Sequence, residues 1–200
     1  MPLTPAVSVA DQYPNTQVIG NDLSPIQPSW IPPNVRFEVD DIELEWMHPE
    51  NSTDLIHMRC LSGSISDWST LLKNCYDNLT PGGYLEFVDY SCSIHCDDGS
   101  MPPDSAFKRF FELTNIASER AGRPLASAKE IKGLMQTLGF EDVVEKRYKW
   151  PIGAWAKDRK LKEIGRWSLP GMIDSLDAFA MGLLTRQLGW CQEQVGFGGL

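Results

Sequence analysis

Hydrophobic and polar positions change their period along the first half of the chain, which predicts alternating strands and helices. Short β-branched and aromatic runs predict a buried strand at 16–20 and further strands at 35–39, 53–58 and 84–90. Between the last two runs, Asp67 to Leu79 places apolar side chains three and four residues apart, which predicts an amphipathic helix. We expect this helix to end at a turn over 80–83, where either glycine can adopt a positive φ.

The second half of the chain predicts mainly helices. They are expected at 104–121, 127–138, 157–167 and 173–194, with one strand of charged and apolar residues within 140–150. Half of the 14 prolines fall within the first 33 residues, so we expect residues 1–15 to be extended. The domain is then expected to span 16–195, with a flexible tail over 196–200. The alternation favours an α/β fold with a mainly parallel sheet and helices on both faces.

The chain is acidic, with 18 Lys and Arg residues against 27 Asp and Glu residues and a net charge of -9. This balance argues against a nucleic acid partner, which selects basic surfaces. No apolar run approaches the roughly 20 residues of a membrane helix, and residues 1–5 lack the basic and apolar regions of a secretory signal. We therefore expect no membrane partner and an intracellular location, cytoplasmic or nuclear.

Five cysteines are scattered through the chain, which predicts free thiols rather than a disulfide framework. Cys92 and Cys96 flank His95, and this spacing raises the alternative of a metal site. Zinc sites usually supply two ligand pairs at short spacing, and here the second pair is limited to His57 and Cys60. We therefore interpret the cysteines as buried or half-buried thiols and expect no metal site.

Three consecutive predicted strands run into acidic or polar residues: Asp22, then Asp40 and Asp41, then His57 and Arg59. In an open parallel sheet, ligands bind beyond the carboxyl ends of the strands. A carboxylate there can accept two hydrogen bonds from a ribose diol, and a second one can accept from an adenine amino group. Aspartate after a strand is equally expected as a turn or helix-cap residue. The spacing alone leaves both interpretations open.

Eight segments carry a more specific signal. They are 18–28 (VIGNDLSPIQP), 35–41 (VRFEVDD), 54–59 (DLIHMR), 65–68 (ISDW), 79–86 (LTPGGYLE), 138–140 (LGF), 150–153 (WPIG) and 161–165 (LKEIG). In this order they resemble class I S-adenosylmethionine-dependent methyltransferases, and more narrowly the fungal LaeA-like group associated with secondary metabolism. The resemblance covers 17–195 and is specific as a set, because each segment alone is short.

This resemblance implies a Rossmann-like fold with S-adenosyl-L-methionine as the cofactor. It implies that Asp22 accepts hydrogen bonds from the two ribose hydroxyls. Asp40 or Asp41, with Ile42 beside it, would bound the adenine. The implied function is methyl transfer in secondary-metabolite biosynthesis or its regulation, and the implied acceptor is a small-molecule metabolite or a protein.

The resemblance also places His57 and Arg59 beside the methionine end of the cofactor and the methyl acceptor. Methyl transfer from a sulfonium is an in-line displacement that depends mainly on proximity and alignment, with a base only if the acceptor carries a proton. His57, Tyr90 and His95 are the candidates for such a base. Packing or surface polarity is the alternative role of each.

The family begins with a central first strand and a glycine-rich turn. The segment before Gln17 has no glycine and no β-branched run of strand length. We therefore expect a domain truncated at its N-terminal side, with the second and fourth strands of the family paired directly or with backbone edges left open. This raises an alternative function, a degenerate and catalytically impaired methyltransferase fold that acts as a binding or regulatory partner. A protein partner would then complete the sheet.

The segment 146–166 holds eight basic and two acidic residues, with Trp150 and Trp155 between them. It can form a polyanion or membrane patch, a solvated face, or a counter-charge to the acidic first half. With Trp167 and Trp190, these tryptophans can line an acceptor pocket for a flat or greasy metabolite, or they can pack in the core.

Overall fold

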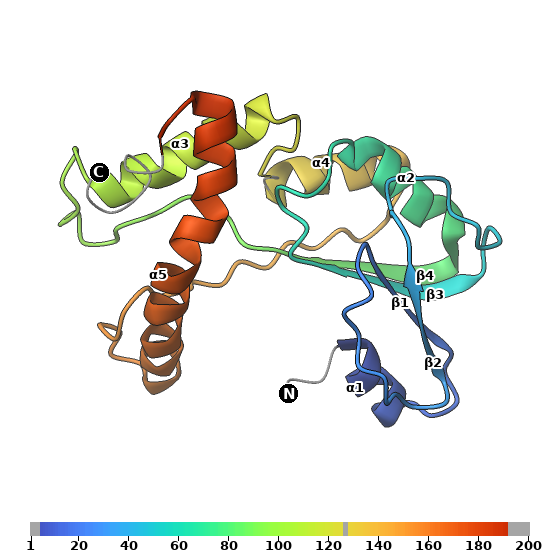
Figure 1. Ribbon diagram of the computed structural model, residues 1–200. Helices are drawn as coiled ribbons and strands as arrows, with labels where there is room; N and C mark the ends of the chain where they lie inside the picture. The colour runs from blue at the N-terminus through green and yellow to red at the C-terminus, as the bar shows by residue number, and fades with distance from the viewer. Residues whose placement is uncertain (1–4, 126–127, 192–200) are drawn as a thin grey trace. The chain divides into compact units, whose positions relative to one another are not determined.

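The computed structural model describes residues 5–125 and 128–191. In this part of the chain the helices are α1 (Pro5–Gln12), α2 (Trp68–Asn78), α3 (Ala106–Arg120), α4 (Ala128–Leu138) and α5 (Arg159–Leu188) (Figure 1). The strands are β1 (Val18–Asp22), β2 (Val35–Val39), β3 (Thr53–Arg59) and β4 (Leu79–Val88). The chain divides into two compact units, Met1–Pro49 and Glu50–Leu200, and each has its own sheet.

In the first unit, β1 and β2 form a two-stranded parallel sheet. Its register runs from Val18 opposite Val35 to Asp22 opposite Val39. Because the two strands are parallel and in register, their carboxyl ends meet at the same edge. The strand predicted at 35–39 is confirmed, and the one predicted at 16–20 is confirmed with a shift of two residues, so that Asp22 ends β1.

The helix α1 packs on this sheet and is held there by a buried amide. The side-chain nitrogen of Asn34 lies 3.2 Å from the carbonyl oxygens of Ala10 and Tyr13 and 2.8 Å from that of Thr16. These carbonyls lie at and after the end of α1, where the helix itself leaves them without partners. Asn34 therefore joins the end of α1 to the start of β2.

In the second unit, β3 and β4 form another parallel pair, which brings His57 opposite Glu86. The buried residues of α2 are Trp68, Leu71, Leu72, Cys75 and Asn78. They recur every three or four residues, as the predicted apolar stripe requires. Asp67 caps the helix, since its Oδ1 accepts a hydrogen bond from the backbone nitrogen of Thr70 at 3.0 Å.

A separate apolar cluster joins α3 and α5. Its buried members are Phe110, Ala117, Leu176 and Leu184. Trp190 is partly buried and packs against this cluster just after the end of α5. Gly189 ends the helix with φ 71°, a left-handed conformation that glycine adopts without strain.

The predicted α/β architecture with parallel strands is confirmed, although the strands form two two-stranded sheets rather than one sheet. The helices predicted at 67–79, 104–121 and 127–138 are α2, α3 and α4. The turn predicted at 80–83 is an irregularity inside β4, where the register shifts and Gly82 has φ 85°. Within the described residues, no helix is long and apolar enough to span a membrane.

The expectation of an extended segment over residues 1–15 is wrong, because α1 lies within it. Pro5 is the first residue of this helix. At that position proline is favourable, since its φ already suits a helix and its missing N–H has no intrahelical partner to lose. The number of prolines in this segment led to the prediction of an extended chain, whereas one of these prolines is the first residue of a helix.

Two predictions for the second half are also wrong. Residues 140–150, all of which the structure describes, contain no strand. Val144 and Tyr148 in this segment are largely exposed. The helices predicted at 157–167 and 173–194 are one helix, α5, which continues through Pro170. Proline removes one intrahelical hydrogen bond, and α5 continues past it into the part that packs on α3 through Leu176 and Leu184. Residues 192–194 and the tail predicted over 196–200 lie outside the described residues.

Candidate functional site

The first unit brings two of the predicted cofactor residues together. Asp22 is the last residue of β1, and the backbone nitrogen of Asp40 donates a hydrogen bond to the carbonyl oxygen of Asp22 at 3.1 Å. The parallel register therefore places the two aspartates side by side at the carboxyl edge of the sheet. This is the edge at which open α/β sheets bind ligands.

Each of these carboxylates also organises its own turn. Oδ1 of Asp22 accepts a hydrogen bond from the nitrogen of Ser24 at 2.9 Å. Oδ1 of Asp40 accepts from the nitrogen of Asp41 at 2.8 Å, and Oδ1 of Asp41 accepts from that of Glu43 at 3.0 Å. The turn interpretation thus holds for one oxygen of each side chain. The second oxygen of Asp22 has no hydrogen-bond partner among the described residues.

Ile42 is held beside this edge by a residue that the sequence interpretation missed. The indole nitrogen of Trp46 donates a hydrogen bond to the carbonyl oxygen of Ile42 at 2.9 Å, and both side chains are half-buried. The spacing of four residues was the available signal for this contact. Ile42 and Trp46 add apolar surface next to Asp41. This surface favours contact with a flat aromatic base over contact with water.

In the second unit, His57 is paired with a carboxylate. Its Nδ1 lies 2.8 Å from Oε2 of Glu86 on the neighbouring strand, and both side chains point away from the α2 side, on which Met58 is buried. Arg59 follows on the same exposed face at the end of β3. Glu86 was not predicted as a site residue, although its place in a strand next to β3 allowed the pairing.

The loop after β3 is pinned by another residue that the sequence interpretation missed. Oδ2 of Asp89 accepts hydrogen bonds from the backbone nitrogens of Leu61 at 2.9 Å and Ser62 at 2.8 Å. Its Oδ1 accepts from the nitrogen of Tyr90 at 2.8 Å. Asp89 thus ties the end of β4 to the loop that leads from β3 into α2. Hydrogen bonds of this kind to an ionised carboxylate are strong.

The other candidate bases differ in their surroundings. The Tyr90 ring packs edge to face on Trp150, with ring centroids 6.5 Å apart. Burial raises the pKa of the Tyr90 hydroxyl, and the nearby Cys92 and Asp89 raise it further, so this hydroxyl keeps its proton at neutral pH. His95 lies on an exposed part of the chain. The roles of His57, Tyr90 and His95 stay predictions.

All five cysteines are free thiols, as predicted, but Cys60 and Cys191 are exposed rather than buried or half-buried. Burial raises the pKa of Cys75 to about 12 and that of Cys92 to about 11, which makes both thiols unreactive at neutral pH. The Cys96 thiol donates a hydrogen bond to Oδ1 of Asp98 at 3.1 Å. Within the described residues no group of three or more His, Cys, Asp or Glu side chains is arranged to hold a metal ion.

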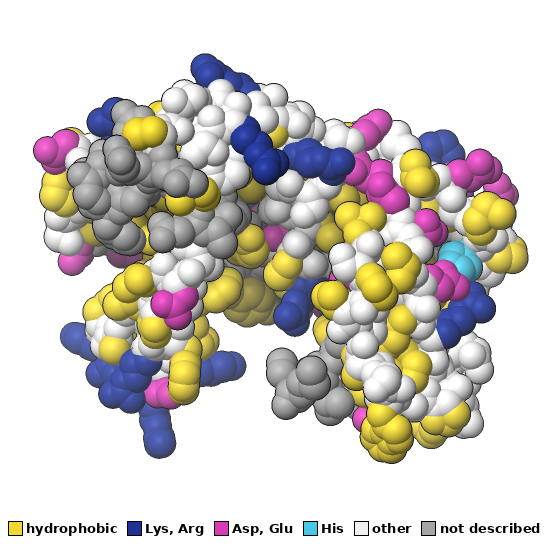
Figure 2. Space-filling view, viewed as in Figure 1, with side chains coloured by type: hydrophobic (Ala, Val, Ile, Leu, Met, Phe, Trp, Pro, Cys, Tyr) yellow, Lys and Arg dark blue, Asp and Glu magenta, His cyan; other side chains and the backbone are white. Residues whose placement is uncertain are grey.

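The four tryptophans of the second half do not form one pocket. Trp150 and Trp167 line an open hollow of about 360 Å³ beside the first half of α5. Trp190 packs on the α3–α5 cluster, and Trp155 is exposed. Figure 2 shows Lys and Arg side chains gathered around the first half of α5, at the lower left of the view, with hydrophobic side chains among them. The first half of α5 contains residues 159–166, the last part of the basic segment 146–166.

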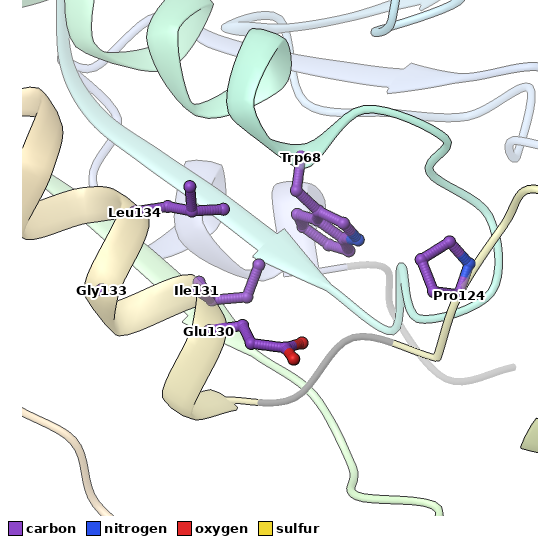
Figure 3. A pocket seen from close by; sticks show the side chains of 6 residues that line it. All are labelled: Trp68, Pro124, Glu130, Ile131, Gly133 and Leu134. Atoms are coloured by element: carbon purple, nitrogen blue, oxygen red, sulfur yellow. The ribbon is translucent and has the colours of Figure 1, made fainter. Parts of the chain in front are cut away.

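A second hollow, of about 450 Å³, lies between the start of α2 and α4 (Figure 3). Its described lining residues are Trp68, Pro124, Glu130, Ile131, Gly133 and Leu134. The lining is mostly apolar, and the volume of the hollow is within the range of small-molecule sites. None of the cofactor residues predicted from the sequence lines this hollow.

Comparisons with known proteins assign this chain to a family. Residues 6–145 match the family model for a methyltransferase domain, and the chain belongs to that family. Among its relatives, the methyltransferase pytC of Aspergillus terreus is 41% identical over 95% of this chain. The secondary metabolism regulators LAE1 of Cochliobolus heterostrophus and laeA of Aspergillus fumigatus are 39% and 32% identical over 92% and 95% of it.

The predicted resemblance to methyltransferases, and to the LaeA-like group among them, is therefore confirmed. The chain covers 59% of pytC, 61% of LAE1 and 51% of laeA. It thus spans between about half and three fifths of the curated relatives it matches.

Proposed function

We propose that this chain acts as an S-adenosylmethionine-dependent methyltransferase in fungal secondary-metabolite biosynthesis or its regulation, in the cytoplasm or nucleus. The observation that carries the proposal is that a backbone hydrogen bond holds Asp22 next to Asp40 at the carboxyl edge of β1 and β2. The chain that contains this edge belongs to the methyltransferase-domain family. S-adenosylmethionine supplies a methyl group activated by a sulfonium. The residues of this chain bind and orient the two reactants.

At the nucleoside end, the second carboxylate oxygen of Asp22 accepts hydrogen bonds from the ribose hydroxyls. This assignment is supported by the half-buried position of Asp22 and by its Oδ1, which is held by Ser24 so that the carboxylate has a fixed direction. Asp40 or Asp41 accepts from the adenine amino group, and Ile42 packs on the ring. A carboxylate whose geometry is already fixed loses little freedom when it binds a diol.

At the transfer end, Glu86 orients His57. If Nδ1 of His57 donates its hydrogen to Glu86, the unprotonated Nε2 is left to take a proton from the acceptor. Arg59, at the end of the same strand, lies on the same face and offers a positive charge to an anionic group of either reactant. The acceptor is a small-molecule metabolite or a protein side chain.

Calorimetric titration of the purified 200-residue chain with S-adenosylmethionine, and with its demethylated product, tests this function. We expect micromolar binding that weakens in Asp22→Ala by about 1.5–3 kcal/mol, the worth of hydrogen bonds to a charged group. Asp11→Ala is the matched control, because Asp11 is an exposed aspartate of the same unit. Unchanged cofactor affinity in Asp22→Ala, with a folded chain, would remove Asp22 as the ribose ligand.

A second candidate function rests on the strand pairing. Each of the four strands has a single hydrogen-bonded neighbour among the described residues. Two-stranded sheets are marginal by themselves, and their open edges can pair with another strand. We therefore propose, as the alternative, a binding or regulatory partner whose sheet another polypeptide completes. No cofactor binding by a folded chain, together with self-association in light scattering, would favour this alternative.

A further inference from the structure

The hollow between α2 and α4 contains a buried hydrogen-bond donor that has no partner in the described part of the chain. Trp68 is 7% exposed, and its indole nitrogen makes no hydrogen bond to the described residues. Buried indole N–H groups usually find an acceptor, because leaving one unpaired costs the hydration it has lost. Figure 3 shows the Trp68 ring lining the hollow, with its nitrogen on the side of Pro124. An acceptor atom placed in the hollow can therefore satisfy this donor.

The walls of the hollow are tied together by backbone contacts. The nitrogen of Gly63 donates a hydrogen bond to the carbonyl oxygen of Pro124 at 3.3 Å, and an Arg123 guanidinium nitrogen donates to the carbonyl oxygen of Ser64. The Trp68 ring packs edge to face on Phe87, with centroids 5.1 Å apart. Phe87 thus holds the tryptophan wall, and the loop that follows β3 holds the proline wall.

The lining defines the chemistry of an occupant. Trp68, Ile131 and Leu134 offer apolar surface, and the indole nitrogen offers a single donor. Glu130 is the charged residue among the described lining, and its carboxylate points toward the hollow in Figure 3. The mostly apolar lining disfavours a charged molecule, because a charge loses its hydration there. The complementary molecule is neutral, mainly apolar and carries an oxygen that accepts a hydrogen bond.

We propose that this hollow binds a neutral apolar metabolite through a carbonyl, ether or hydroxyl oxygen that accepts a hydrogen bond from Trp68, and that this molecule is the methyl acceptor or its product. The second part rests on the proposed methyltransferase function. Trp68 begins the helix that follows β3, and the region beyond the carboxyl end of a parallel strand is where such folds bind their ligands.

The test compares 1-indanone with indane, which differ in one carbonyl group. In a spectrum of the nitrogen-15-labelled chain, the indole resonance absent from Trp68→Phe identifies Trp68 among the 7 tryptophans. We expect 1-indanone to move this resonance downfield and to saturate, and indane to bind about tenfold more weakly, the worth of one hydrogen bond. Trp68→Phe should bind the two compounds equally.

A second variant blocks the hollow without relying on Trp68. Outside its own helix neighbourhood, no described atom lies within 4 Å of the position that a β-carbon at Gly133 would occupy, so Gly133→Leu has room to begin a side chain at the wall. It also removes a helix-weakening glycine from α4. We expect Gly133→Leu to abolish binding of 1-indanone. Gly182→Leu is the matched control in α5, since the space around Gly182 is equally open, and it should leave binding unchanged.

Two results would overturn the proposal. One is equal affinity for 1-indanone and indane in the unaltered chain with no shift of the Trp68 resonance, which would mean that water satisfies the donor. The other is retention of 1-indanone binding in Gly133→Leu, which would place the compound elsewhere. These measurements contain no cofactor. A chain that binds 1-indanone but not S-adenosylmethionine would contradict the proposed function and leave the hollow as a binding site.

Discussion

The two units of this chain differ in the hydrogen bonding of their polar side chains. In residues 1–49, the buried Asn34 and the strand-end Asp22 both bond to nearby backbone. In residues 50–200, three buried side-chain atoms have no hydrogen-bond partner among the described residues, Ser62 Oγ, Trp68 Nε1 and Asn78 Oδ1. The first unit carries one basic and seven acidic residues, whereas the second carries 17 basic and 20 acidic residues.

This difference indicates two kinds of ligand chemistry. The first unit presents carboxylate oxygens, which are acceptors and suit the hydroxyl and amino donors of a nucleoside. The second unit presents an apolar hollow with one hydrogen-bond donor, which suits an apolar molecule that carries a hydrogen-bond acceptor. The proposed ribose contact lies in the first unit and the proposed hollow in the second. Substitutions that affect one unit alone test this contrast most directly.

The largest expected effect concerns Asn34. In Asn34→Ala, the carbonyl oxygens of Ala10, Tyr13 and Thr16 lose a buried donor, and we expect a loss of about 3 kcal/mol in the stability of the first unit. Hydrogen exchange should accelerate at β1 and β2 and stay unchanged at β3 and β4. Equal acceleration in both sheets would show that the two units unfold together, and the contrast between them would lose its thermodynamic meaning.

A smaller effect is expected at Asp89 in the second unit. Asp89→Asn removes the charge that strengthens the hydrogen bonds to the nitrogens of Leu61 and Ser62, and we expect urea unfolding to report a loss of about 2 kcal/mol. Because the loop of these residues leads to Trp68, binding of 1-indanone should also weaken. Asp77→Asn is the control, since its exposed pair with Lys73 contributes little. Unchanged binding in Asp89→Asn would mean that the loop does not position Trp68.

The next effect is a dependence on alkaline pH through Cys75. Burial raises the pKa of this thiol from 9.0 to about 12, so the folded chain keeps a proton that the unfolded chain releases. Stability is therefore complete below pH 9 and falls as pH rises toward 12, by about 1.4 kcal/mol for each pH unit. Urea unfolding at pH 8, 9 and 10 measures the slope, and Cys75→Val should flatten it. An equal slope in that variant would assign the effect to other groups.

The smallest effect concerns the cap of α2. Asp67→Ala leaves the backbone nitrogen of Thr70 without its capping carboxylate, and we expect a loss of about 1 kcal/mol in thermal or urea unfolding. Ser105→Ala at the start of α3 should cost less, because the Ser105 hydroxyl accepts at the longer distance of 3.4 Å. If the two substitutions cost the same, the distance difference between the caps would carry no energetic meaning.

The regular elements of the fold were predicted where a local pattern sufficed. The apolar stripe of α2 and the β-branched run of β2 were read from residues that are neighbours in the chain. The predictions failed where the outcome depends on partners elsewhere. Residues 140–150 pair with none of the four strands, and α5 continues through Pro170 into the part that packs on α3. The candidate site shows the same division. Asp22 and Asp40 were predicted from their positions, whereas Glu86, Trp46 and Asp89 were not.

The sequence by itself determined the parallel α/β class, the methyltransferase family and the acidic strand ends, because these depend on the period of side chains and on short motifs. Only the tertiary structure decided that Asn34 holds α1, that Glu86 faces His57 and that the Trp68 donor is buried with no partner among the described residues. Each of these depends on the register of two strands or on the packing of segments far apart in the chain. Hydrogen bonds form between groups that folding brings within about 3 Å, and no local pattern specifies which groups those are.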